Sequence, residues 1–243
     1  MSERRLTGKL PREAIGCLDL PPVDAKLLEG FRRLGDLAGM VSDALDEIGI
    51  AGAVPSHILQ PTMPGARLVG PALTVLNRRR DVTVADAVAR KDSRLGEIEA
   101  HNLAKPGDVL VVQGIAGISS MGGMSASIGK RQGEAGVVID GAVRDVAHSR
   151  DLNLPIWCRG LTPITGKWRI ETVAVNVAVT IAGIEVMPGD IVVADDSGVC
   201  FIPLARAPEV LERCQRIAAD EERRTKIINS GTPVPDLVPK PKG

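Results

Sequence analysis

Aromatic residues are nearly absent from this chain of 243 residues, which contains two Trp, two Phe and no Tyr. Proteins that bind single-stranded nucleic acid stack the bases on aromatic side chains, so this class of function is disfavoured. Net charge is also lacking, because 30 Lys and Arg residues balance 30 Asp and Glu residues. Without a basic field the chain is not expected to attract nucleic acid.

Cysteine is sparse, and no two cysteines form a CxxC pair. The four are Cys17, Cys158, Cys200 and Cys214. This spacing argues against a zinc or redox motif and predicts reduced core residues of a cytoplasmic protein. The N-terminus lacks the apolar core of a signal peptide, and no apolar run approaches the length of a membrane span. We therefore expect a cytoplasmic protein that does not contact membranes.

The length and patterning predict one α/β domain. We expect an N-terminal arm over residues 1–23, the domain over 24–230 and a Pro-rich tail over 231–243. Apolar spacing predicts a helix after the cap Asp24, a second helix carrying Val41, Ala44, Leu45 and Ile48 with Ser42 or Asp43 near its start, a third over 83–104, and a long one opened by Pro208. A strand is expected over 66–76, with a break at Gly70-Pro71, and another over 155–159. One strand should follow each of the two Pro-Gly-Asp turns. Several consecutive strands are expected over 170–202, in a second sheet layer.

The run GVVIDGAVRD, residues 136–145, is the most informative stretch. Its apolar first half is too short for a helix and is bounded by glycines, so it predicts a buried strand. Arg144 and Asp145 then lie just beyond the carboxyl end of that strand, where ligands usually bind in α/β sheets. Arg144 suits a carboxylate or phosphate, and Asp145 is an oxygen ligand for Mg²⁺ or Mn²⁺. On these two residues alone, a helix start with a solvated arginine is the simpler interpretation.

A glycine- and serine-rich segment, GIAGISSMGGMSASIGKRQGEAG, precedes this strand at residues 114–136. A loop of this composition before a helix can present backbone amides to an anion. It contains no GxGxxG, so it does not predict a dinucleotide site.

Several segments together resemble one known family. VVIDGAVRD, VSDALDEIGI, GARLVGPALTV, LPIWCRGLTP and PGDIVVADDSGVCFIP occur in the order typical of the family of the regulator of ribonuclease activity A (RraA) and the class II 4-hydroxy-4-methyl-2-oxoglutarate aldolases. The resemblance covers roughly residues 35 to 225. It implies an α/β fold with a layered β/β/α sandwich, the swivelling-domain type of RraA, and assembly into a homotrimer or hexamer.

The resemblance also implies a chemistry. Enzymatic members are metal-dependent lyases that cleave 4-hydroxy-2-oxo acids to pyruvate and decarboxylate oxaloacetate through a pyruvate enolate. Carried over to this chain, Asp145 would hold a divalent metal, Mg²⁺ or Mn²⁺, and Arg144 would contact the substrate. The loop Gly122, Gly123, Met124 and Ser125 would offer backbone amides to the pyruvyl carboxylate.

One position departs from the aldolase pattern. The aldolases carry an acidic residue where this chain has Gly123. The acids that would compensate are Glu97, Glu99, Asp195 and Asp196, which the sequence does not rank. Two hypotheses follow: a metal-dependent lyase that acts on a small carboxylated 2-oxo acid, and a non-catalytic RraA-like regulator that binds a ribonuclease. The retained Arg144–Asp145 pair favours the lyase, and Gly123 favours the regulator.

Overall fold

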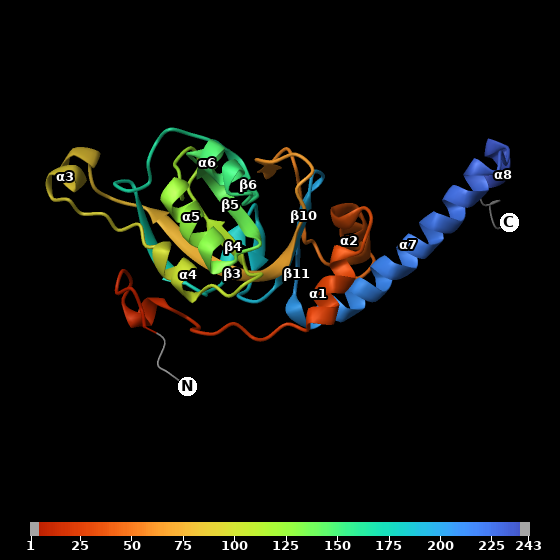
Figure 1. The fold of residues 1–243 in the computed structure, drawn as a ribbon, viewed down its shortest axis with the longest axis horizontal. Helices are drawn as coiled ribbons and strands as arrows, with labels where there is room; N and C mark the ends of the chain where they lie inside the picture. Colours follow the sequence, from red (N-terminus) through yellow and green to blue (C-terminus); the bar gives the residue numbers. More distant parts are fainter. Residues whose placement is uncertain (1–4, 239–243) are drawn as a thin grey trace.

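In a computed structural model that describes residues 5–238, two stacked halves of one β-sheet carry helices on both outer faces (Figure 1). The strand order in the sheet is β1-β11-β10-β3-β4-β5-β6-β2, and β7 pairs with β3. The strands are β1 (Ala53–Pro55), β2 (Gln60–Pro61), β3 (Leu68–Arg79), β4 (Val109–Gln113), β5 (Gly136–Val143), β6 (Ile156–Leu161), β7 (Ile170–Val175), β10 (Ile191–Asp195) and β11 (Gly198–Ile202). A separate hairpin consists of β8 (Val179–Ile181) and β9 (Ile184–Val186).

Strand β3 belongs to both halves of the sheet. Residues Leu68 to Pro71 pair antiparallel with β10, and Ala72 to Leu76 pair parallel with β4. The predicted break at Gly70-Pro71 is therefore wrong, since the strand continues through it. Proline lacks an N–H donor and is tolerated where the ladder changes. Gly70-Pro71 is the point at which β3 passes from one half of the sheet to the other.

Alternation of side chains along the strands produces two cores on the opposite faces of the parallel sheet. Val109, Val111 and Trp157 face the second half of the sheet and pack with Val192 and Phe201. The alternate residues of β4 and β5 face the opposite way and pack beneath α4 (Ile98–Leu103), α5 (Gly123–Gln132) and α6 (Val146–Asp151). The predicted β/β/α layering is confirmed.

A second helical layer, not included in that prediction, covers the outer face of β10 and β11. It consists of α1 (Ala25–Arg32), α2 (Leu37–Asp46) and the first half of α7 (Ala207–Asn229), whose apolar residues share a core with Val193 and Ile202. The side chain of Asp24 caps α1 as predicted, accepting a hydrogen bond from the Lys26 N–H at 2.8 Å. Helix α2 starts earlier than predicted, because Asp36 provides its cap.

Two further predictions need correction. Residues 83–104 do not form one helix but two, α3 (Val84–Ala89) and α4, since Lys91 has a left-handed backbone (φ 51°) that ends the first. The strands over 170–202 do not share one layer, since β7 pairs with β3 and only β10 and β11 join β1 in the second half.

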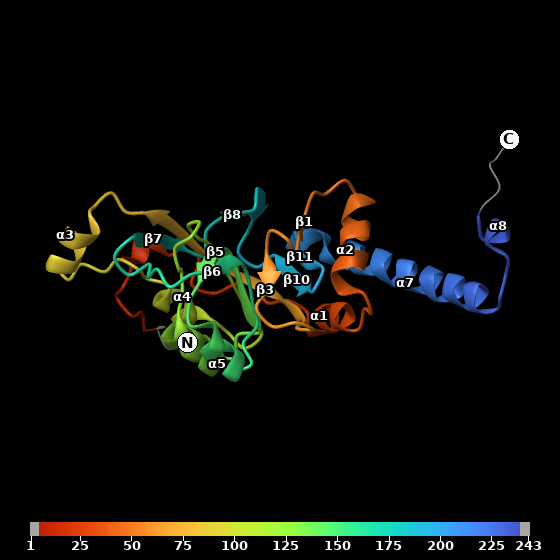
Figure 2. The ribbon, with the colours of Figure 1, turned by 90° about the horizontal axis from the view of Figure 1, so that it is seen from above.

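The ends of the chain behave differently from one another. The first four residues of the predicted arm lie outside the described range. Residues 5–23, which contain the turn η1 (Arg12–Ala14), pack on the domain and bury Leu10, Ile15 and Leu20 in the core under α4 and α5. By contrast, the distal half of α7 extends away from the body towards α8 (Val234–Leu237), and α3 projects at the opposite end (Figures 1 and 2). A short turn, η2 (Leu204–Arg206), connects β11 to α7. The last five residues of the predicted tail lie outside the described range.

The cysteines are free, as predicted, and three of them are core residues. Burial raises the pKa of the Cys158 thiol to about 11 and that of Cys200 and Cys214 to about 12, which makes these thiols unreactive. Within residues 5–238, no helix combines the length and the apolar character needed to cross a bilayer.

Trp157 should be the most sensitive single position in the inter-sheet core. It is fully buried, and its indole Nε1 donates a hydrogen bond to the Asp195 carbonyl oxygen at 2.9 Å, which ties β6 to the end of β10. We expect Trp157→Ala to lower the free energy of unfolding by about 3–5 kcal/mol, measured by urea denaturation. Trp168→Ala is the matched control, because that indole is partly exposed and should cost less than about 1 kcal/mol. Equal losses in the two variants would contradict this account of the core.

Candidate active site

The candidate site lies where β5 ends and two helices begin. Arg144 and Asp145 follow β5 directly, as predicted, and the chain then enters α6. Asp145 has a left-handed backbone (φ 57°, ψ 35°), which is uncommon for a residue other than glycine but accessible to aspartate. This conformation turns the chain sharply at the end of the strand.

The Asp145 carboxylate does not cap its own helix. It accepts no hydrogen bond from the first turn of α6, so the simpler interpretation of a helix start does not describe it. Instead, Oδ2 accepts a hydrogen bond from the Gly123 N–H at 3.0 Å and lies 3.4 Å from Arg144 Nε. Asp145 therefore links the end of β5 to the first turn of α5. Its side chain stays about half exposed.

The loop residues predicted to bind substrate gather around this pair. Gly122, Gly123, Met124 and Ser125 line a cavity of about 260 Å³ together with Arg144 and Asp145. Gly122 caps α5, and the next three residues form the helix's first turn. The amino end of a helix carries partial positive charge, so this wall of the cavity attracts an anion.

Close approach explains the glycine at position 122 but not the one at position 123. A Cβ on Gly122 would lie 2.7 Å from Asp145 Oδ2 and 3.0 Å from Arg144 Nε, so a side chain there would displace the pair. A Cβ on Gly123 would lie 3.2 Å from His148 Cδ2, a contact that a small movement of the imidazole relieves. Gly123 is helical, so the missing acid is not explained by a left-handed backbone at that position.

The structure ranks the four candidate acids. Glu97 lines the cavity, whereas the other three hold distant parts of the fold. Glu99 accepts hydrogen bonds from Thr7, Asp195 from the Ala38 N–H, and Asp196 from the Gly65 N–H. Removal from water raises the pKa of Glu97, which favours its neutral form.

Several lining residues were not predicted from the sequence. Lys167 adds a second cation, and Ser119 and Thr165 add hydroxyl groups. Ser119 and Thr165 are joined by a parallel bridge, which brings the loop after β6 to the cavity. Nothing local in the sequence marks this loop, because its contribution depends on a tertiary contact.

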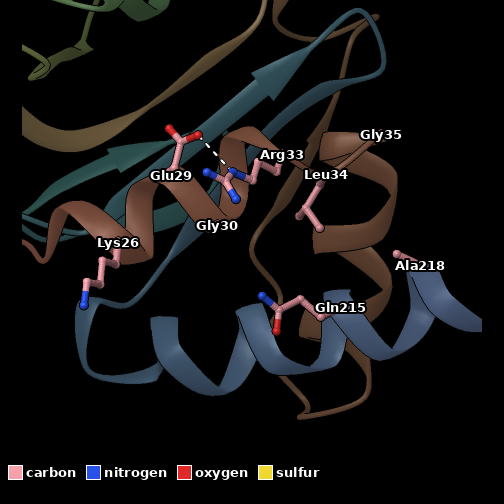
Figure 3. A pocket seen from close by; sticks show the side chains of 8 residues that line it. All are labelled: Lys26, Glu29, Gly30, Arg33, Leu34, Gly35, Gln215 and Ala218. Carbon is pink, nitrogen blue, oxygen red and sulfur yellow. Dashed lines mark hydrogen bonds and ion pairs between the residues drawn. The ribbon is translucent and has the colours of Figure 1, made fainter.

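A second hollow, of about 490 Å³, lies between α1 and α7 (Figure 3). Its charged side chains include Glu29 and Arg33, which pair with each other at 3.0 Å. Apart from this exposed pair and Lys26, it is lined by small, apolar and amide residues. It brings no nucleophile or acid–base pair together, so the cavity beside Arg144 and Asp145 is the candidate active site.

Comparisons with known proteins identify the family and the fold. A relative from Halalkalibacterium halodurans, named "Putative 4-hydroxy-4-methyl-2-oxoglutarate aldolase", is 34% identical over 191 residues, which are 78% of this chain and 83% of the relative. The solved structure of Streptomyces coelicolor RraAS2, described as an unusual member of the RNase ES inhibitor RraA protein family, has a TM-score of 0.71 and 32% identity, covering 83% of this chain and 96% of that chain.

An uncharacterized protein from Pseudomonas syringae pv. tomato is also similar in structure, with a TM-score of 0.75, 28% identity and coverage of 89% of this chain and 98% of that chain. The model of the RraA-like family, described as Aldolase/RraA, matches residues 38–201. This match includes the β5 strand, the Arg144–Asp145 pair and the first turn of α5. The chain belongs to the RraA-like family.

Proposed function

We propose that this protein is a divalent-metal-dependent lyase that cleaves or decarboxylates a small carboxylated 2-oxo acid and releases pyruvate. One observation carries the proposal: Arg144 and Asp145 share a single cavity with the first turn of α5. Family membership and the aldolase names of several relatives support a lyase. We propose the cytoplasm as its compartment, in keeping with the reduced cysteines.

The charges of the cavity suit a small polyanion. Arg144 is a permanent cation, and its terminal nitrogens have no hydrogen-bond partner within residues 5–238. Lys167 and the amino end of α5 add positive potential from two other walls. A volume of about 260 Å³ accommodates a 2-oxo acid with one or two further carboxylates.

The donor set fits Mg²⁺ or Mn²⁺ rather than a metal held entirely by protein side chains. Among the described residues, no group of three or more His, Cys, Asp and Glu side chains is arranged to hold a metal ion. Mg²⁺ commonly binds through one or two carboxylates and keeps waters and substrate oxygens as its other ligands. Asp145 is the carboxylate that would hold it. When bound, the cation would supply Lewis-acid stabilisation of the negative charge that develops on the keto oxygen.

The protein's own residues then have separate tasks. Arg144 would bind a substrate carboxylate or keto oxygen and stabilise charge at the same point. The Gly123 amide already donates to Asp145, so the next two amides in the first turn of α5 would orient the pyruvyl carboxylate. The raised pKa of Glu97, which results from its removal from water, favours a protonated carboxyl that would donate a hydrogen bond to the anionic substrate.

A non-catalytic regulator is the second candidate. The similarity to Streptomyces coelicolor RraAS2 and the glycine at position 123 favour it. Exposed apolar side chains at Met124, Leu161 and Ile164 lie near the site and would suit a protein contact. The same residues are compatible with a homotrimer or hexamer, the assembly we propose for this chain.

Metal dependence is tested by a pyruvate-release assay with oxaloacetate and 4-hydroxy-2-oxo di- and tricarboxylates, in Mg²⁺, in Mn²⁺ and without metal. We expect activity with metal that Asp145→Asn lowers on the order of 100-fold, about 2.7 kcal/mol in transition-state stabilisation. Asparagine tolerates the left-handed backbone of position 145, so the loss would report the charge rather than misfolding. Parent activity in Asp145→Asn, or after exhaustive chelation, would reject this mechanism.

Glu97 is tested by comparing two substitutions in the same assay. If the neutral carboxyl acts as a hydrogen-bond donor, Glu97→Gln should stay within about threefold of the parent, because the amide also donates. Glu97→Ala should lose about tenfold, the effect of about 1.4 kcal/mol expected for one lost hydrogen bond. If Gln is as damaging as Ala, the negative charge of Glu97 is required and the neutral-donor role is wrong.

A further inference from the structure

Three polar side chains form a hydrogen-bonded chain that leads from the cavity into the interior. Ser125, in the first turn of α5, lines the cavity and is 7% exposed. Its Oγ lies 2.7 Å from Nε2 of His101, which belongs to α4. The Nδ1 of the same imidazole lies 2.6 Å from Oε1 of Glu134, just beyond α5. The side chains of His101 and Glu134 are both 0% exposed.

The two contacts suit a chain in which each group donates inward. A carboxylate accepts, so Glu134 would hold the His101 proton on Nδ1. In that tautomer of the neutral ring Nε2 accepts, and the Ser125 hydroxyl donates to it. This directs the Ser125 proton at the imidazole and leaves the lone pairs of Oγ for a group in the cavity. The order serine, histidine, carboxylate is the one that activates a hydroxyl for proton transfer.

Burying this network costs folding free energy, because one of its polar atoms has no partner in the described part of the chain. Within the described residues, Glu134 Oε2 is buried without a hydrogen-bond partner, and such groups are rare in native proteins. Helix α5 has a glycine at position 129, where a Cβ would lie 2.5 Å from Glu134 Oε2 and 3.3 Å from His101 Cε1. An apolar trio would pack the same space without burying an unpaired oxygen. The network therefore calls for a functional explanation. Of its three residues, Ser125 is the one that lines the cavity.

We propose that Ser125, His101 and Glu134 form the proton relay of the lyase reaction, an inference that rests on the function proposed above. Ser125 Oγ takes the proton of the substrate's 4-hydroxyl while its own proton moves to His101 Nε2. The carbon–carbon bond then breaks, leaving a carbonyl product and an enolate. The proton returns from His101 through Ser125 to the enolate carbon, giving pyruvate. One proton is taken and one is returned, so the cycle needs no other reactant.

In this relay Ser125 is the catalytic residue, because it alone reaches the cavity. His101 and Glu134 are positioning residues, since they act through its hydroxyl. Glu134 fixes the tautomer of the ring and stabilises it when it carries the transferred proton.

The chain offers a matched control on the same helix. Ser127 Oγ lies 2.8 Å from His148 Nε2, so α5 carries a second serine–histidine pair. Ser127 is not among the residues that line the cavity. Ser127→Ala removes a similar hydrogen bond without touching the proposed relay.

The test measures three quantities in the full-length protein with Mg²⁺: kcat and KM for pyruvate release, the rate of exchange of the pyruvate methyl protons in D₂O, and the affinity for oxalate. We expect Ser125→Ala to lower kcat and the exchange rate about 100-fold or more, the contribution typical of general acid–base catalysis. KM and oxalate affinity should stay within about threefold. His101→Gln and Glu134→Gln should lower the same two rates, and Ser127→Ala should match the parent.

The outcomes separate the relay from the function on which it rests. If Ser125→Ala keeps the parent's kcat and exchange rate, the relay is overturned and the lyase stands. If oxalate affinity falls as much as kcat, Ser125 is a binding residue and the relay is again overturned. A parent protein that neither releases pyruvate nor exchanges its methyl protons overturns the lyase and the relay together. Ser125→Ala decides the matter even if the His101 variant fails to fold, because it leaves the buried pair intact.

Discussion

The hydrogen bond from the Gly123 N–H to Asp145 Oδ2 joins the two segments on which the site depends. One segment is the end of β5, held rigid between two parallel neighbours, and the other is the first turn of α5. The left-handed backbone of Asp145 points its carboxylate across this gap, and the absence of a side chain at Gly122 leaves room for it. Both segments line the cavity, and the contact holds them together there.

Local patterns were sufficient to predict the parts of the fold that are governed by local physics. The buried strand at GVVIDGAV, the two strands after Pro-Gly-Asp turns and the helix capped by Asp24 follow from apolar runs, turn residues and caps. The course of β3 through Pro71 did not follow, because the strand is continued by pairing with β10 and then β4. At such a position, pairing with neighbouring strands outweighs the low strand propensity of glycine and proline.

The residues of the candidate site also fall into those that could be predicted from the sequence and those that could not. Arg144, Asp145 and the loop from Gly122 to Ser125 are close to one another around the cavity, as the resemblance to the RraA-like family implied. Glu97 could not be ranked above Glu99, because the end of one short helix presents the two side chains to different surroundings. His101 and Glu134 had no signal at all. They meet Ser125 only because α4 packs beside α5.

The distinction between a lyase and a regulator depends on whether the cavity binds a planar dianion together with a divalent cation. Calorimetric titration of the protein with oxalate, with and without Mg²⁺, measures this directly. The account predicts one oxalate per chain in Mg²⁺ and an affinity at least about tenfold lower without it, a difference of about 1.4 kcal/mol. Equal affinity in both conditions, or no binding in either, would contradict it.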